Sequence, residues 1–464
     1  MKKIIQYFTH SSHKYIRESV FLLVALVLCA FIHLWNPVGF PSFHIDESYY
    51  LRRAMLVIQG TGPQEPATSG YPQLYDHPYF GQIFLAGALS LIGYPQILNP
   101  VSDERSIILL HMIPRLFMGI IAILDTFLVF KIARTRYNLT VAFIASVLFA
   151  VMPMTWILRR VYLDTLLMPF MLSSILFAMC LKKSSGDLLQ STEGTKMEAS
   201  EAVLALISGI CLGLAIYTKI PAFTMMTLVG SLVFFNSKKK LMNLTIWLIP
   251  VILIPTLWPL YSAAAGQTDL WLHGIIWQTS RYKPLSLSLT NFLQIDPLIT
   301  VAGIAGFIWT GLRKDFFALV WVVPFLIFSY FIGWVQYFHL IVIFPAFCIA
   351  TAVLIYRVQR LLVRHNLMLI SKAPLIIIVT FGLIVSTILI SSDLNANYFK
   401  IYAAIAKNIP NTQNSNEKDK AVMGDIKAIL DLAKDLEVQA DENQSKRVLS
   451  GKMKIGRASC RERV

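Results

Sequence analysis

Long apolar stretches, separated by shorter polar segments, fill this chain as far as about residue 392. Each is close to the roughly 20 residues that an α-helix needs to cross about 30 Å of hydrocarbon. The stretches begin near residues 19, 108, 139, 164, 202, 221, 242, 297, 316, 340 and 374. This pattern predicts an all-α polytopic membrane protein with about 11 transmembrane helices.

Composition supports the same class. The chain has 56% hydrophobic and only 14% charged residues, which excludes a water-soluble globular protein. Four of the five cysteines lie inside apolar stretches, where a free thiol behaves as a small hydrophobic group. Their spacing predicts neither a zinc site nor a disulfide framework.

Basic residues mark every second loop. Four of them, Lys2, Lys3, Lys14 and Arg17, precede the first stretch. Others follow in alternate loops: Lys131, Arg134, Arg136, Lys182, Lys183, Lys196, Lys238, Lys239, Lys240, Arg313, Lys314, Arg357, Arg360, Arg364 and Lys372. Because cytoplasmic loops are rich in Lys and Arg, residues 1–18 are predicted to be cytoplasmic and the intervening loops extracytoplasmic.

One further apolar segment, residues 79–94, tests this topology, since another crossing would place the later basic loops outside. The segment has about 16 residues and contains three glycines, which is short for a span. We expect a juxtamembrane or re-entrant helix within one long outer loop, residues 36–107.

This topology brings unusual polar residues to one face of the membrane. They are Asp46, Glu47, Asp76, His77, Arg159, Arg160, Asp164, Lys219, His273, Arg281, Tyr337 and His339. Any one of them could be a charged side chain reaching from a helix end to water. A dozen on the face that is poor in other cations indicates a functional site.

Several of these residues belong to ordered short motifs. An acidic pair follows the first span in HIDESYY, and a second acidic residue precedes a proline in YDHPYFGQ. Further motifs are RRVYLD, GICLGLAIYTKIP and LWLHGIIWQTSRY. Over about residues 15–360 this order resembles the GT-C superfamily of lipid-linked sugar transferases, especially the protein O-mannosyltransferases and the lipid A aminoarabinose transferases.

Two features distinguish the chain within that resemblance. Many relatives have two prolines after the second acidic residue, whereas this chain has HPY, so Asp76 and His77 match less closely than Asp46. A Trp-Trp-Asp motif is missing from the sequence, which argues against the oligosaccharyltransferase branch.

The resemblance implies a membrane glycosyltransferase whose catalytic domain is residues 19–392. Such an enzyme moves a sugar from a polyprenyl-phosphate donor to a hydroxyl of a protein, lipid or glycan on the extracytoplasmic face. Nucleic acid is not an expected partner. Two other classes remain open, a transporter or flippase of lipid-linked sugars and a non-catalytic assembly subunit. The polar residues gather at one face and repeated halves are not evident, which favours the enzyme.

This chemistry requires a base for the acceptor hydroxyl, and Asp46 is the candidate because partial shielding at the membrane boundary raises the pKa of a carboxyl group. The alternative is an N-cap role for Asp46 at an interfacial helix over residues 47–58. Glu47 points about 100° away on such a helix and is expected to support Asp46, bind sugar hydroxyls or face water.

Asp164 and Asp46 are candidate ligands of a divalent cation, because oxygen ligands suit Mg²⁺, Mn²⁺ or Ca²⁺. A salt bridge between Asp164 and Arg160 is the alternative. The candidates for binding the donor phosphate are cationic: Arg159, Arg160, Lys219 and Arg281.

Weaker candidates for substrate binding lie in two outer segments. His273 stands between Trp271 and Trp277, whose rings suit either sugar stacking or the lipid interface. Tyr337 and His339 precede the tenth span, where the resemblance implies polar groups near the lipid phosphate.

The composition changes after the last span. Residues 393–454 are predicted to form an extracytoplasmic soluble tail with an amphipathic helix over residues 421–440. The final segment, 455–464, resembles translated read-through of a sequencing adapter. We therefore expect the natural chain to continue beyond Lys454.

Overall fold

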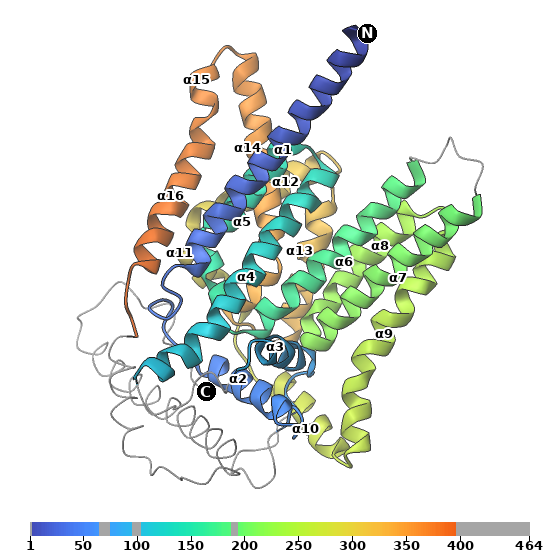
Figure 1. Ribbon diagram of the computed structural model, residues 1–464, viewed down its shortest axis with the longest axis vertical. Coiled ribbons are helices and arrows are strands. Elements are labelled where there is room, and N and C mark those ends of the chain that lie inside the picture. Colours follow the sequence, from blue (N-terminus) through green and yellow to red (C-terminus); the bar gives the residue numbers. More distant parts are fainter. Residues whose placement is uncertain (1, 65–74, 95–103, 187–193, 396–464) are drawn as a thin grey trace.

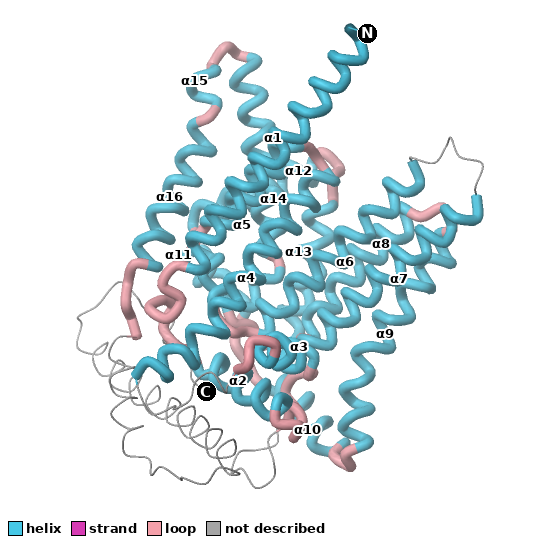
Figure 2. The backbone as a smooth tube through the Cα atoms, viewed as in Figure 1, coloured by secondary structure: helices cyan, strands magenta, loops and turns pink. Residues whose placement is uncertain are grey.

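The computed structural model describes residues 2–64, 75–94, 104–186 and 194–395, and the predicted tail and adapter-like segment lie outside these ranges. The described part is built from helices joined by loops (Figure 2). It contains no β-strand, only an isolated bridge between Lys283 and Trp334.

In its described part, the first half of the chain forms a series of α-helices with two short 3-10 helices among them. They are α1 (Lys2–Leu34), α2 (Ile45–Ile58), α3 (Phe80–Ser90), α4 (Glu104–Arg136), α5 (Leu139–Val151), η3 (Pro153–Arg159), α6 (Leu163–Gly186), α7 (Gly194–Thr218), η4 (Ile220–Met225) and α8 (Met226–Asn236).

The second half continues the bundle. Its helices are α9 (Lys240–Ala264), α10 (Thr268–Ser280), α11 (Leu285–Ile295), α12 (Pro297–Leu312), α13 (Phe317–Ile332), η5 (Tyr337–Val342), α14 (Phe344–Arg364), α15 (Met368–Ser371) and α16 (Ala373–Ile390).

All eleven predicted apolar stretches coincide with helices of the described chain. Seven of these helices are long and apolar enough to cross a membrane, or nine if two bent pairs each count as one span. The two remaining stretches correspond to the shorter apolar helices Ile220–Asn236 and Phe317–Ile332. The polytopic helical class is therefore confirmed, while the number of eleven crossings remains a prediction.

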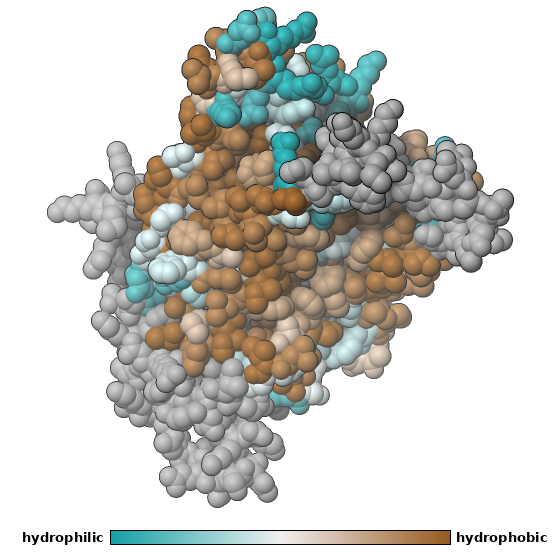
Figure 3. Space-filling view, turned by 45° about the horizontal axis from the view of Figure 1, so that its top comes forward, coloured by the Kyte–Doolittle hydropathy of each residue, from teal (hydrophilic) through white to brown (hydrophobic). Residues whose placement is uncertain are grey.

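The surface agrees with a membrane environment. A broad hydrophobic area covers the middle of the molecule, and hydrophilic side chains gather near the top of the view (Figure 3). The long helices α1, α9 and α16 have large apolar side chains on the outside, among them Leu23, Leu253 and Ile377. Such exposure is what lipid-facing helices require.

Close helix packing depends on glycine in one place. In α7 a Cβ atom at Gly209 would lie 2.3 Å from the carbonyl oxygen of Trp247, and one at Gly213 would lie 2.6 Å from that of Pro250. The two glycines are four residues apart and so lie on one helix face. They let the backbones of α7 and α9 approach closely, as small residues do in membrane bundles.

The first long loop forms short helices at one end of the bundle. Helices α2, α3 and α10 lie at the bottom of Figure 1, opposite the N-terminal end of α1 and the turn between α14 and α15. The segment over residues 79–94 becomes α3, which has only 11 residues. At about 1.5 Å per residue it is too short to cross the hydrocarbon, while its juxtamembrane position stays a prediction.

Candidate active site

A cavity of about 890 Å³ opens at this end of the bundle. Its lining includes six of the polar residues that the sequence singled out: Asp46, Asp76, His77, Lys219, Arg281 and His339. They come from α2, the loop before α3, the α7–η4 junction, the end of α10 and η5. Helices α9 and α13 supply an apolar wall that includes Pro255, Phe325 and Phe328.

Asp46 lies in the first turn of α2, and its carboxylate is partly open to the cavity. Burial raises the pKa of Asp46 to about 6, the charge of Lys219 opposes the shift, and the charge of Asp76 adds to it. The N-cap alternative is wrong, because His44 caps the helix and accepts a hydrogen bond from the Asp46 amide at 3.3 Å. Asp46 is therefore free of the capping role.

His44 also lies at the cavity. Burial and the charge of Arg160 lower its pKa to about 3, so the ring is neutral near pH 7. The Asp46 carboxylate lies 3.7 Å from the ring nitrogen Nδ1. Because the ring is uncharged, this contact does not neutralise Asp46.

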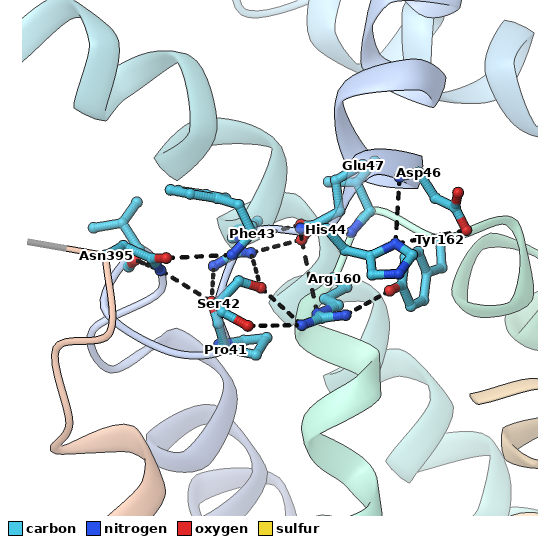
Figure 4. A network of polar contacts seen from close by, with 12 residues as sticks. Pro41, Ser42, Phe43, His44, Asp46, Glu47, Arg160, Tyr162 and Asn395 are labelled. Carbon is cyan, nitrogen blue, oxygen red and sulfur yellow. Dashed lines mark hydrogen bonds and ion pairs between the residues drawn. The ribbon is translucent and has the colours of Figure 1, made fainter. Parts of the chain in front are cut away.

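Glu47 points away from Asp46 and into the bundle (Figure 4). Its Oε1 atom lies 2.6 Å from Nη2 of Arg115, and its Oε2 atom accepts hydrogen bonds from Nε of Arg115 at 2.9 Å and from the Val161 amide at 3.3 Å. Burial alone would raise the pKa of Glu47, but the charge and hydrogen bond of Arg115, together with Arg160 and the Val161 amide, lower it. Glu47 is thus a buried, ionised anchor of α2 and does not face water.

Asp76 faces the cavity while held by a neighbouring arginine. Nη1 of Arg53 lies 2.9 Å from its Oδ1 atom. Burial opposes ionisation, yet the charge of Arg53 and its hydrogen bond lower the pKa of Asp76. Burial lowers the pKa of His77 to about 3, so a neutral ring stands beside a carboxylate at the cavity wall.

Lys219 and Asp164 form a buried ion pair, with Nζ and Oδ2 2.6 Å apart. Lys219 lines the cavity and Asp164 lies behind it, 2% exposed. Asp164 therefore pairs with Lys219, and the described contacts place Arg160 elsewhere, on Tyr162, Ser42 and Glu47.

The Lys219–Asp164 pair affects the divalent cation that was expected on Asp46 and Asp164. Oδ2 of Asp164 already accepts a hydrogen bond from the Lys219 ammonium. The described residues contain no group of three or more His, Cys, Asp or Glu side chains that could hold a metal ion. Asp46 and Asp164 thus do not form a ready-made site, and the divalent cation stays a prediction from the sequence.

Arg281 ends α10 and points to the cavity between two aromatic rings. Its guanidinium carbon lies 4.1 Å from the ring centre of Trp277 and 4.4 Å from that of Trp334, and an amino group donates to the Gln278 side chain. Such stacking orients a guanidinium and leaves edge N–H groups available to a ligand.

Two predicted phosphate ligands lie outside the cavity lining. Arg159 is fully buried and donates to the backbone carbonyls of Ile32, Trp35 and Asn36 at 2.6–2.7 Å. Arg160 donates to the Tyr162 hydroxyl at 2.6 Å and to the Ser42 carbonyl at 2.8 Å. Both arginines hold the segment that leads into α2.

Two further predicted residues also lie away from the cavity lining. His273 is exposed on α10, although its neighbours Trp271 and Trp277 reach the cavity. Tyr337 is buried against Trp156, with ring centres 6.1 Å apart. His339, in contrast, lines the cavity.

Two residues of the site, Arg52 and Arg115, were not among those predicted from the sequence. Arg52 lines the cavity next to Tyr49, and Arg115 anchors Glu47. Arg115 interrupts the apolar stretch that begins near residue 108, and an arginine inside a span is itself a sign of a specific partner. The sequence around Arg52 gave no comparable indication, because Arg52 lies outside the predicted spans and close to other charged residues.

Comparison with known proteins supports the resemblance. Residues 73–267, less than half of the chain, match the family model of dolichyl-phosphate-mannose-protein mannosyltransferases. Curated proteins gave no match.

Solved structures share the fold at low sequence identity. The apo oligosaccharyltransferase of Archaeoglobus fulgidus superposes with a TM-score of 0.55 at 12% identity, over 88% of this chain and 59% of that one. ArnT from Cupriavidus metallidurans bound to undecaprenyl phosphate gives 0.53 at 17% identity, over 89% and 74%. The chain thus spans less than two thirds of the oligosaccharyltransferase.

These matches agree with the geometry of the site. The family segment contains the loop with Asp76 and His77, the buried Lys219–Asp164 pair and all of α7 to α9. The shared fold covers 89% of this chain and therefore extends beyond that segment. The resemblance to GT-C lipid-linked sugar transferases predicted from the sequence is therefore confirmed, by a family segment over residues 73–267 and by a shared helical fold.

Proposed function

We propose that this protein is an integral membrane glycosyltransferase that moves a sugar, a hexose or a pentose, from a polyprenyl-phosphate donor to an acceptor hydroxyl. The main support is that Asp46, whose pKa is raised, lines the same cavity as the cations Lys219 and Arg281. Base and phosphate-binding groups are the two requirements of this reaction.

Asp46 acts as the base. It takes the proton of the acceptor hydroxyl while that oxygen forms a bond to the anomeric carbon of the sugar. The bond from this carbon to the phosphate oxygen breaks, and polyprenyl phosphate leaves with the electron pair. A carboxylate with a pKa of about 6 is ionised near pH 7 and still basic enough to assist.

Lys219 and Arg281 receive the charge that develops on the leaving phosphate. Arginine supplies directed N–H donors and lysine a compact charge, and both act more strongly in a partly dehydrated cavity than in water. The apolar wall from α9 and α13 suits the first isoprene units of the donor. Among the similar structures, one of ArnT has undecaprenyl phosphate bound, and one of the archaeal oligosaccharyltransferase is a complex with a dolichol-phosphate.

The acceptor is a protein, lipid or glycan hydroxyl, and the site faces the extracytoplasmic side. The side follows from the alternation of basic loops, which puts the N-terminal end of α1 in the cytoplasm. The site lies at the opposite end of the bundle (Figure 1). Accessibility labelling of a single cysteine placed at exposed Asp269, compared with one at exposed Lys239, tests this orientation.

The direct test is sugar transfer by purified protein in lipid, using a panel of polyprenyl-phosphate sugars. Asp46→Asn is expected to abolish transfer while donor binding and folding persist. Asp269→Asn is the matched control, because Asp269 is exposed on α10 and outside the cavity lining. Retained transfer by Asp46→Asn would refute the base role, and flipping of donor lipid without transfer by the wild type would favour a transporter.

A further inference from the structure

The chain segment that follows α16 crosses the loop that leads into α2. The Leu394 amide donates to the Gly39 carbonyl at 2.9 Å. In the opposite direction, the side chain of Asn36 donates to the carbonyls of Ile390 and Ser392 at 3.0 and 3.1 Å. Two segments more than 350 residues apart in sequence are thereby joined at the end of the bundle that holds the cavity.

Asn395 makes the central contacts of this junction (Figure 4). Its side chain is 3% exposed. Oδ1 accepts from the Phe43 amide at 3.2 Å, and Nδ2 donates to the carbonyls of Val38 and Pro41 at 2.6 and 3.0 Å. The site requires an acceptor and a donor at once, which the amide group of asparagine provides.

The contacts of Asn395 lead directly to the acidic pair. The Pro41 carbonyl that accepts from Asn395 also accepts from Nη1 of Arg115 at 2.8 Å, and Arg115 holds Glu47. The Phe43 ring lies 4.4 Å from the guanidinium of Arg115. The residue after Phe43 is His44, which caps α2 and binds the Asp46 amide.

We propose that Asn395 is a positioning residue for Asp46. It fixes the backbone over residues 38–43, so that α2 begins at the place where the Asp46 carboxylate faces the cavity. The segment after the last membrane helix is thereby coupled to the reacting end of the site. The kinetic consequence rests on the proposed transferase activity, whereas the coupling itself does not.

Hydrogen–deuterium exchange tests the coupling without any activity. In Asn395→Ala, peptides covering residues 36–58 are expected to exchange faster than in the wild type, because the Phe43 amide loses its acceptor. Asn395→Asp is expected to be intermediate, since it keeps an acceptor for Phe43 but lacks the donor to Val38 and Pro41. Asp393→Ala is the control, because Asp393 lies in the same segment and is exposed. Unchanged exchange in both Asn395 variants would overturn the proposal.

Kinetics then test the effect on the site. We expect kcat of Asn395→Ala to fall about tenfold to a hundredfold, because small displacements of a reacting group have effects of that size. KM for the donor should change less than about twofold, since Lys219 and Arg281 lie on other elements. The values for Asp393→Ala should equal those of the wild type.

The outcomes separate the two proposals. A KM effect without a kcat effect, or a kcat equal to that of Asp393→Ala, would refute positioning of Asp46. If the wild type shows no sugar transfer but Asn395→Ala exchanges faster than the wild type over residues 36–58, the transferase is refuted and the coupling stands. If Asn395→Ala does not fold, Asn395→Asp, which preserves the side-chain volume, decides by the same two measurements.

Discussion

Glu47 and Arg115 form a buried ion pair in which Oε1 lies 2.6 Å from Nη2. Arg115 belongs to a long apolar helix and Glu47 to the first turn of α2, so the pair attaches the short helix to the bundle. Its neighbour Asp46 is left to face the cavity. The two adjacent carboxylates thus differ in their surroundings, since Glu47 holds α2 to the bundle and Asp46 lines the cavity.

Loss of this anchor should destabilise the protein. Arg115→Met leaves Glu47 buried without its partner, and removing one member of such a pair costs about 3–5 kcal/mol. Thermal unfolding in detergent measures the change. Arg136→Met is the control, because its pair with Asp315 is partly exposed and is worth about 1 kcal/mol or less. Equal effects of the two substitutions would contradict the anchor role of Glu47.

Transfer should decline in acid. The pKa of Asp46 is about 6 and its ionised form is the base, so kcat/KM should fall toward tenfold per pH unit below about pH 6. Measurement from pH 5 to pH 8 with saturating acceptor checks the profile. Any residual activity of Asp46→Asn should lack this acid limb. A wild-type rate that rises as the pH falls would exclude Asp46 as the base.

The Lys219–Asp164 pair should show separate effects on stability and on donor binding. Lys219→Met alone leaves Asp164 uncompensated and is expected to destabilise by about 3–5 kcal/mol. Adding Asp164→Leu should recover much of that stability, because an apolar pair replaces the ionic one. Donor binding should remain weak in the double variant, since the cavity still lacks the ammonium. Restored donor binding would show that Lys219 acts only as a partner of Asp164.

Gly274 should be needed for the position of Asp76 and His77. A Cβ atom at this residue would lie 2.4 Å from the carbonyl oxygen of Tyr75, which precedes Asp76. Gly274→Ala is therefore expected to push the loop away from α10 and to lower kcat/KM at least about tenfold. Gly87→Ala in α3 is the matched control, because open space surrounds it and alanine favours a helix. Equal activity of both variants would contradict the close approach.

Much of the fold was predictable because membrane helices are encoded locally. Each apolar stretch has to satisfy its backbone hydrogen bonds within itself, so its length and composition indicate a helix wherever it packs. The short helix within residues 79–94 was also expected, because three glycines and limited length are local features, while its place at the membrane surface stays a prediction. The motifs likewise identified Asp46, Lys219 and Arg281 as cavity residues.

The partners of the buried charges could not be predicted in this way. Asp164 is four residues from Arg160 but pairs with Lys219, which lies between α7 and η4, and Arg159 donates to backbone carbonyls at the end of α1. Neighbours in sequence compete with side chains that packing brings from distant helices. Spacing along the sequence does not reveal which partner best compensates a buried charge.

The sequence by itself therefore determined the membrane-spanning class, the short helix over residues 80–90 and six of the residues that line the cavity. The tertiary structure decided which of the predicted residues face the cavity, and which of them, with Arg115 and Asn395, hold the loop before α2. The physical reason is that helix formation in a membrane depends on local hydrogen bonding and hydrophobicity. The pairing of buried polar groups depends instead on distances between segments up to 357 residues apart.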